Sequence, residues 1–260
     1  MFIREIRGCF WFWYGRNEMV DIHCHILPAI DDGAESWEVT AKMCRLAALD
    51  GITHIVATPH YDAQFDYDRE HFTDMLATLS EVADGRLTFS IGCDFHVTPH
   101  NVAEALANPQ RFAIGDSRYL LVEFDHHGIP MNASELLMAL TSRGMVPIIT
   151  HPERNAFLIK HPETVLRFID AGCLVQVTAN AFTGFWGTKS RKAAEWLLHR
   201  EAIHVVASDA HDLKLRPPVL SEARDRVAAL VGMEIADALV RQNPAAIVSG
   251  QHVPFSPVHR

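Results

Sequence analysis

The sequence has few cysteines, and they are not arranged to build a framework. Its 260 residues include five cysteines, an odd number, and no two of them form a Cys-x-x-Cys pair. Disulfide scaffolds and zinc knuckles need paired or closely spaced cysteines, so neither is expected and a reducing, cytoplasmic compartment is favoured. No arginine stands six residues after any of the five, which argues against the Cys-x5-Arg phosphate loop of cysteine phosphatases.

Basic charge and long apolar runs are also scarce. The chain has 23 Lys and Arg against 32 Asp and Glu, a formal net charge of −9, and no basic cluster. Nucleic acids are bound through clustered basic side chains, so no nucleic-acid partner is expected. The run Cys9-Phe-Trp-Phe-Trp-Tyr14 is too short to span a bilayer and precedes no small-residue cleavage site, so we expect no stable membrane insertion.

Residues 1–18 are predicted to be an extension outside the folded unit, which we expect to span residues 19–260 as a single domain. Met19 opens the first segment that has the pattern of folded protein. A start codon assigned too far upstream accounts best for the extension. An interfacial anchor and a partner-binding tail are the alternatives.

From Val20 onward, short apolar runs alternate with longer amphipathic stretches. Strands are predicted at 20–25, 53–58, 87–92, 119–124, 146–150, 174–178 and 204–208, and helices at 37–51, 68–83, 133–144, 162–172, 189–200 and after 221. Repeated strand–helix units form parallel sheets, and about seven of them in this length favour closure into a barrel. No G-x-G-x-x-G loop follows the first strand, which argues against an open nucleotide-binding sheet. The predicted fold is α/β, a distorted (β/α)7 barrel.

Barrels of this kind place their chemistry at the carboxyl ends of the strands, and polar residues occur there. The first predicted strand ends in His23-Cys-His25, where alternation puts both histidines on one side. The last predicted strand runs into Asp209-Ala-His211, with the same i, i+2 spacing. An isolated pair such as His23 and His25 is more often a pair of hydrogen-bonded barrel histidines than a metal site, and the second pair strengthens the metal interpretation.

Four more predicted strand ends carry a possible ligand each. These residues are His60, Asp94, Glu123 and His151. Taken singly, His60 is as typical of a surface loop and Glu123 of a salt bridge. Because so many strand ends present oxygen or nitrogen donors, we predict a polynuclear metal site where they meet.

The loops after these strands supply weaker candidates. Asp31-Asp32-Gly33 follows the first strand and is either a simple turn or the source of a further ligand, Asp32. His96 and His100 lie just beyond Asp94 and are less favoured as ligands.

One arginine stands close to a predicted ligand. Arg154 follows His151 by three residues, and its planar guanidinium suits the oxygens of a phosphate group. The alternative is that Glu153 holds Arg154 in a plain surface pair.

Taken in order, these motifs resemble those of the polymerase-and-histidinol-phosphatase superfamily of metal-dependent phosphoesterases. The set is D-I-H-C-H, D-D-G, T-P-H, E-F, T-H-P-E-R and S-D-A-H, and the match covers nearly all of Met19 to His252. More narrowly, the sequence is similar to the bacterial protein tyrosine phosphatases of capsule and exopolysaccharide operons. Its more specific motifs for that group are Asp31-Asp-Gly33, His151-Pro-Glu-Arg154 and Arg216-Pro-Pro.

The resemblance implies two or three divalent metals, most often manganese, with iron or zinc as alternatives. The ligand sets that it implies are His23, His25, Asp94 and Asp209 for one metal, His60, His151 and a bridging Asp94 for a second, and Asp32, Glu123 and His211 for a third. It also implies that Arg154 binds phosphate with help from Arg216, and that Arg154, Asp209 and His211 carry the catalysis. Asp94 departs from the family, which usually has glutamate there, so the bridge is expected to have its own geometry.

The resemblance further implies a substrate, the phosphotyrosine-bearing tail of a bacterial tyrosine kinase that controls polysaccharide export, and association into a homo-oligomer. The alternatives are a small-molecule phosphatase acting on histidinol phosphate or a sugar phosphate, and a non-catalytic metal-binding scaffold. An amidohydrolase-type barrel is disfavoured because no strand end carries a lysine. An aryl substrate needs an apolar wall, and the loop aromatics that are candidates for it are Phe65, Tyr67, Phe182, Phe185 and Trp186.

Overall fold

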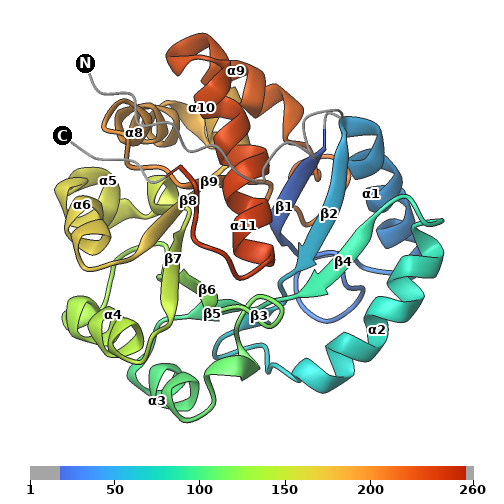
Figure 1. The fold of residues 1–260 in the computed structure, drawn as a ribbon, viewed down its shortest axis with the longest axis horizontal. Helices are drawn as coiled ribbons and strands as arrows, with labels where there is room; N and C mark the ends of the chain where they lie inside the picture. The colour runs from blue at the N-terminus through green and yellow to red at the C-terminus, as the bar shows by residue number, and fades with distance from the viewer. Residues whose placement is uncertain (1–17, 256–260) are drawn as a thin grey trace, which may run out of the picture.

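Strands and helices alternate along residues 18–255, the part of the chain that the computed structural model describes (Figure 1). The strands are β1 (Met19–Cys24), β2 (Ile52–Ala57), β3 (His60–Tyr61), β4 (Thr88–Ile91), β5 (Asp94–His96), β6 (Tyr119–Glu123), β7 (Val146–Thr150), β8 (Leu174–Thr178) and β9 (Val205–Ala207). The helices on the amino-terminal side of β8 are α1 (Trp37–Asp50), α2 (Arg69–Val82), α3 (Pro99–Ala107), α4 (Ala133–Ser142), α5 (Ala156–Lys160) and α6 (Glu163–Asp170). Those after β8 are α7 (Ala179–Thr183), α8 (Gly187–His199), α9 (Ser221–Val231), α10 (Met233–Asp237) and α11 (Asn243–Val248).

Side-chain caps fix where several helices begin. Ser36 accepts a hydrogen bond from the Val39 amide and starts α1, and Asp68 accepts one from the His71 amide and starts α2. Helix α3, which the sequence pattern did not predict, begins with Thr98 as its cap and Pro99 in its first turn. It is a short helix of nine residues.

All strand pairs are parallel, and two of the predicted strands are each followed, after a short break, by a further strand that was not predicted. The sheets have the orders β1-β2-β4 and β3-β5-β6-β7-β8-β9, in which β3 continues the path of β2 and β5 continues that of β4. Pro59, which has no backbone N–H, lies at the first break, and Gly92 lies at the second. Hydrogen bonds from the Gly92 amide to the Ala57 carbonyl (2.8 Å) and from the Asp94 amide to the Pro59 carbonyl (3.0 Å) carry the pairing across the breaks.

The first and last strands close the sheet. The Asp209 amide donates to the His23 carbonyl, and the His25 amide donates to the Ala210 carbonyl, both over 2.8 Å. The described residues therefore form seven strand positions around a closed circle, and the predicted distorted (β/α)7 barrel is confirmed.

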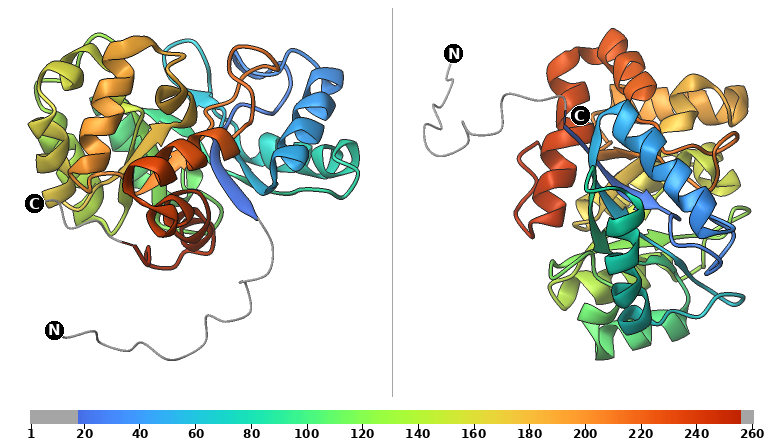
Figure 2. Two further views of the ribbon diagram at one scale, coloured as in Figure 1. Left: turned by 90° about the horizontal axis from the view of Figure 1, so that it is seen from above. Right: turned by 90° about the vertical axis from the view of Figure 1, so that its right-hand side faces the viewer.

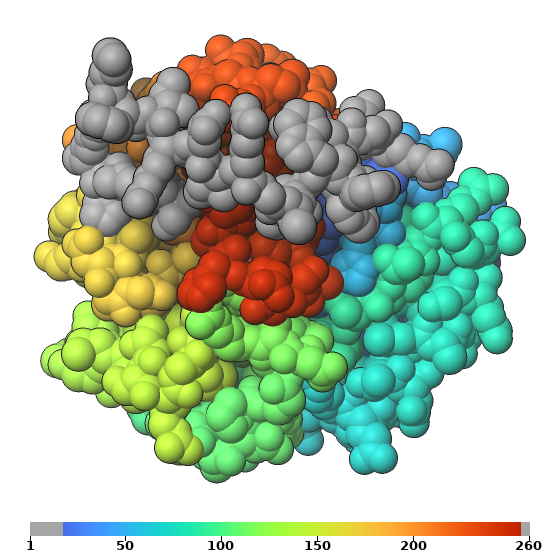
Figure 3. All heavy atoms as spheres, in the orientation of Figure 1, coloured from blue at the N-terminus to red at the C-terminus, as the bar shows by residue number. Residues whose placement is uncertain are grey.

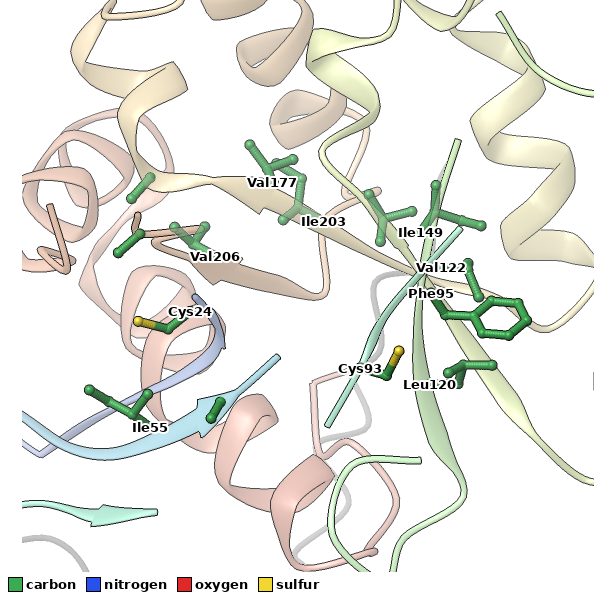
Figure 4. Close-up of a cluster of buried hydrophobic side chains, with 14 of the residues drawn as sticks. Cys24, Ile55, Cys93, Phe95, Leu120, Val122, Ile149, Val177, Ile203 and Val206 are labelled. Carbon is green, nitrogen blue, oxygen red and sulfur yellow. The ribbon is translucent and has the colours of Figure 1, made fainter. Parts of the chain in front are cut away.

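The barrel has two apolar cores. One fills its interior, where α11 closes the end at which the strands begin, which we call the floor; Ile247 of α11 packs there with Val20, Tyr119, Leu174 and Val205. Figure 2 shows the carboxy-terminal helices gathered at this end, and Figure 3 shows α11 in the middle of that face. The other core lies between strands and outer helices, and Figure 4 shows outward-facing side chains of successive strands within it, such as Ile55, Val122 and Val206.

Among residues 18–255, no helix is long and apolar enough to cross a membrane. The predicted extension, apart from Glu18, lies outside the described residues, so its proposed origin stays a prediction.

Candidate metal centre

The carboxyl ends of the strands meet at the end of the barrel opposite the floor, which we call the mouth. In β1, the pairing with β2 shifts register between Asp21 and Cys24. Such a bulge reverses the alternation of side chains. Ile22 packs in the interior core and His23, the next residue, also faces inward, toward Asp94. The bulge therefore lets an apolar interior change into a ligand-bearing mouth within one strand.

The first group of donor atoms lies deepest. The Nε2 atoms of His23 and His25 are 3.2 Å apart, and Oδ2 of Asp94 is 3.3 Å from the His23 Nε2. Asp209 adds its Oδ1 at 3.3 Å from that same nitrogen. All four side chains are at most 1% exposed. These are the four residues that the resemblance implies for one metal.

A second group adjoins the first through Asp94. His60 Nδ1 lies 3.3 Å from Oδ2 of Asp94 and 3.6 Å from Oε2 of Glu123. Nε2 of His151 lies 3.3 Å from the other Glu123 oxygen. Glu123 is therefore placed beside Asp94 and His151, whereas the resemblance implied it for the third metal.

The third group surrounds Asp32. Its Oδ1 is 3.3 Å from Nε2 of His60 and 3.2 Å from Nε2 of His211. His25 also offers a donor atom to this group. His60 thus faces Asp32 through one ring nitrogen and Asp94 through the other.

The chemistry of these atoms suits divalent cations. Both Asp94 oxygens, His60 Nδ1 and His211 Nε2 are buried and have no hydrogen-bond partner among the described residues. Buried polar atoms without partners are costly, and two imidazole nitrogens facing each other at 3.2 Å repel unless a proton or a cation lies between them. Mixed imidazole and carboxylate donors are typical ligands of manganese, iron and zinc.

Burial and mutual charge set the protonation of the centre. Burial alone lowers the pKa of His23, but the carboxylates of Asp94 and Asp209 outweigh it and raise that pKa to about 9. In the same way the pKa of His60 rises to about 10, because Asp32 and Asp94 overcome the effect of burial. Burial and the neighbouring His211 instead lower the pKa of His25 to about 3. Burial and the Asp94 charge raise the pKa of Glu123.

Two residues that the sequence reasoning did not assign hold the inner histidines in place. Oδ2 of Asp31 lies 2.7 Å from Nδ1 of His25 and accepts a hydrogen bond from the His60 amide (3.1 Å). The Gln176 Oε1 lies 2.9 Å from the His23 Nδ1. Such partners fix which ring nitrogen is free to bind a metal. The signal for Gln176 was a polar residue inside an apolar strand, and for Asp31 it was the first acid of the D-D-G loop.

Gly33 brings that loop against β1. A Cβ atom at this position would lie 2.3 Å from the His25 carbonyl oxygen and 2.5 Å from the His25 Cβ. Only glycine therefore lets the loop approach closely enough for Asp31 and Asp32 to reach the histidines.

Both candidate phosphate-binding arginines point at Asp209. Nη2 of Arg216 donates to Oδ2 of Asp209 over 2.6 Å, and Nη1 of Arg154 donates to the same oxygen. Together with His23, the two arginines lower the pKa of Asp209 despite its burial. The alternative of a surface pair between Glu153 and Arg154 is wrong, because Glu153 is fully buried and accepts a hydrogen bond from the Thr178 amide (3.0 Å).

Strained backbone marks two of these positions. His151 and Asp209 have positive φ angles, 33° and 52°, immediately after β7 and close after β9. Such conformations cost energy for residues other than glycine and occur mainly where the surroundings enforce them. Here they turn both side chains from the strand path toward the centre.

An open cavity of about 270 Å³ leads to the centre. Its walls include residues from all three donor groups, both arginines, and Phe65, His96 and His126. Of the aromatic candidates, Phe65 lines the cavity and stacks on His60 with 6.0 Å between ring centroids, whereas Tyr67 and Phe182 are buried in the outer core. His100 is exposed on α3 and lies 3.9 Å from Glu104.

Known proteins are similar to this chain over nearly its whole length. Residues 19–249 match the family described as capsular polysaccharide synthesis, CpsB/CapC. The chain is 32% identical to the tyrosine-protein phosphatase YwqE of Bacillus subtilis, covering 93% of this chain and 97% of the relative. It is also 32% identical to the tyrosine-protein phosphatase CpsB of Streptococcus pneumoniae, covering 90% and 99%.

A solved structure agrees with these sequence matches. It comes from a study of YwqE and CpsB described as unique metal-dependent tyrosine phosphatases. It superposes with a TM-score of 0.85 at 30% identity over 93% of this chain and 100% of the other.

Proposed function

The chain belongs to the CpsB/CapC family of capsular polysaccharide synthesis, and from this premise we propose that it is a metal-dependent protein tyrosine phosphatase. The observation that carries the proposal is the convergence of the imidazole and carboxylate donors with two arginines on one cavity. Arginines beside a cationic centre suit a phosphate dianion.

The proposed ligands are the residues that the three donor groups bring together. They are His23, His25 and Asp209 with Asp94, then Asp94, Glu123 and His151, and then Asp32, His60 and His211. We propose manganese as the resident metal, and bound divalent metals would polarise the phosphoryl group and activate water at neutral pH.

The side chains at the cavity divide the remaining work. Arg154 and Arg216 bind phosphate oxygens through the N–H groups that Asp209 leaves free, and Asp209 holds both arginines toward the centre. Phe65 offers an apolar wall to the aryl ring. The leaving phenolate has a pKa of about 10, much lower than an alkoxide, so phosphotyrosine needs little help from a general acid.

The substrate and setting follow from the family. We propose that the enzyme acts in the cytoplasm on the phosphotyrosine-bearing tail of a tyrosine kinase that regulates capsule or exopolysaccharide synthesis. The names of the relatives and the reduced cysteines among residues 18–255 support this setting.

Hydrolysis of matched substrates tests the proposal. Protein stripped with a chelator and reloaded with manganese is given a phosphotyrosine peptide, a phosphoserine peptide and histidinol phosphate. We expect preference for the phosphotyrosine peptide, loss of turnover in His151→Ala, and unchanged turnover in His161→Ala, a surface histidine that serves as the control. Preference for histidinol phosphate would identify a small-molecule phosphatase, and metal loading without any turnover would identify a binding scaffold.

A further inference from the structure

Trp186 lies under the two arginines of the proposed phosphate site. The Arg154 Cζ lies 4.0 Å from the centre of the indole ring, and the Arg216 Cζ lies 5.7 Å from it. The residue immediately precedes α8 and packs against the outer core. We propose that Trp186 is a positioning residue, which aligns both guanidinium groups for phosphate binding; this inference rests on the proposed function.

The indole belongs to a continuous chain of contacts that reaches the metal centre. Both guanidinium groups that contact it donate to one oxygen of Asp209, and the other oxygen of that carboxylate faces His23. A guanidinium held on one side by a ring face and at one edge by a carboxylate has few remaining orientations. Its other N–H groups are then directed into the cavity before substrate arrives, which reduces the ordering cost of binding.

The surroundings of the ring support this role over two simpler ones. These are a hydrogen-bonded structural anchor and an apolar wall for the aryl group of the substrate. Nε1 of Trp186 is buried without a hydrogen-bond partner among the described residues, so no polar anchor sets the ring orientation. Phe185 supports the ring edge-on at 5.1 Å. Because Arg154 covers the indole, that face is closed to the aryl group of a substrate, and Trp186 is not among the cavity walls.

The test compares Trp186→Leu with Trp186→Phe in manganese-loaded protein. We expect Trp186→Leu to raise KM for the phosphotyrosine peptide about tenfold and to weaken binding of inorganic phosphate, measured by calorimetry, by a similar factor. The turnover number should change by less than about threefold, because orientation of the arginines acts mainly on binding. Trp186→Phe, which keeps an aromatic face, should stay within about threefold of the wild type.

The matched control lies on α8, the helix that follows Trp186. Trp196 also carries an arginine over its ring, Arg200 at 4.9 Å, but contributes nothing to the cavity. Trp196→Leu should leave KM and phosphate binding unchanged. The unfolding temperature and the metal content of every variant are measured to detect a general loss of structure. If Trp186→Leu loses structure, Trp186→Phe is the variant that tests whether an aromatic face is enough to keep phosphate binding.

A double-mutant cycle separates alignment from packing. In an Arg154→Ala background, Trp186→Leu should weaken phosphate binding by much less than tenfold, because its main partner is gone. Equal effects in both backgrounds, or unchanged phosphate binding in Trp186→Leu, would overturn the proposal. If the wild type binds phosphate but hydrolyses no phosphotyrosine, the proposed function fails while the calorimetry still decides the role of Trp186.

Discussion

In β6, Tyr119 and Leu121 pack in the apolar interior of the barrel, and Glu123, next on the same face of the strand, lies beside His60 and His151. The floor and the mouth are thus parts of the same strands. At the floor, apolar side chains fill the space and α11 closes it. At the mouth, buried charges face one another, and several donor atoms have no hydrogen-bond partner within residues 18–255.

Within each strand, the residues at the floor contribute mainly to stability and those at the mouth mainly to function. Apolar burial at the floor stabilises the fold without specifying any chemistry. The mouth gathers buried charged groups, whose removal from water costs stability. Substitutions at the two ends should therefore affect different measurements.

The largest effect is expected at Asp94, which joins the first two donor groups. Loss of a residue that only hydrogen-bonds to a metal ligand costs up to roughly 100-fold in activity. Asp94→Ala, which removes a proposed ligand itself, should reduce phosphatase activity by more than that. Asp94→Glu keeps both oxygens and should retain more activity. Turnover and metal content, measured on the same samples, check this, and an active Asp94→Ala enzyme would remove Asp94 from the centre.

At the floor, Ile247→Ala should lower the free energy of unfolding by about 2–5 kcal/mol, because it leaves a cavity in a fully buried interior. The turnover number of the folded protein should stay unchanged. Urea denaturation measures the first quantity and steady-state kinetics the second. Leu49→Ala, at a position that is 80% exposed, is the control. A large loss of turnover in Ile247→Ala would show that the two ends are not separable.

Acid should weaken metal binding. The pKa values of about 9 for His23 and about 10 for His60 mean that both are protonated at neutral pH in the metal-free protein. Metal must displace these protons, so its apparent affinity should rise with pH by about tenfold per unit for each proton released. Manganese titrations at pH 6, 7 and 8 measure the slope. A flat profile would mean that these histidines bind no metal.

The smallest effect should come from residues that hydrogen-bond to the proposed metal ligands without binding metal themselves. Asp31→Ala removes the partner of His25 and should lower manganese affinity about tenfold, with little change in unfolding temperature. Asp66→Ala, an exposed acid in the loop before α2, should change neither. Equal affinities in the two variants would contradict the role assigned to Asp31.

The sequence predicted the barrel because alternating strands and helices admit few closed arrangements, and the family resemblance is confirmed by the comparisons. It also named side chains that meet at the mouth, since parallel strands bring their carboxyl ends together. The resemblance implied the first donor group, but not that Glu123 lies beside Asp94 and His151. That depends on the breaks at Pro59 and Gly92, which shift His60 and Asp94 relative to Glu123. Gln176 was missed because its contact with His23 spans 153 positions of sequence.

Closure between β1 and β9 also determines when during synthesis the metal centre can form. His23 is among the first residues of the barrel to leave the ribosome and Asp209 among the last, yet their atoms lie 3.3 Å apart. A nascent chain can therefore not assemble the complete centre until nearly all of the barrel has been synthesised. Contacts between such distant positions form slowly. The complete set of ligands is therefore available to metal only late in the synthesis of each molecule.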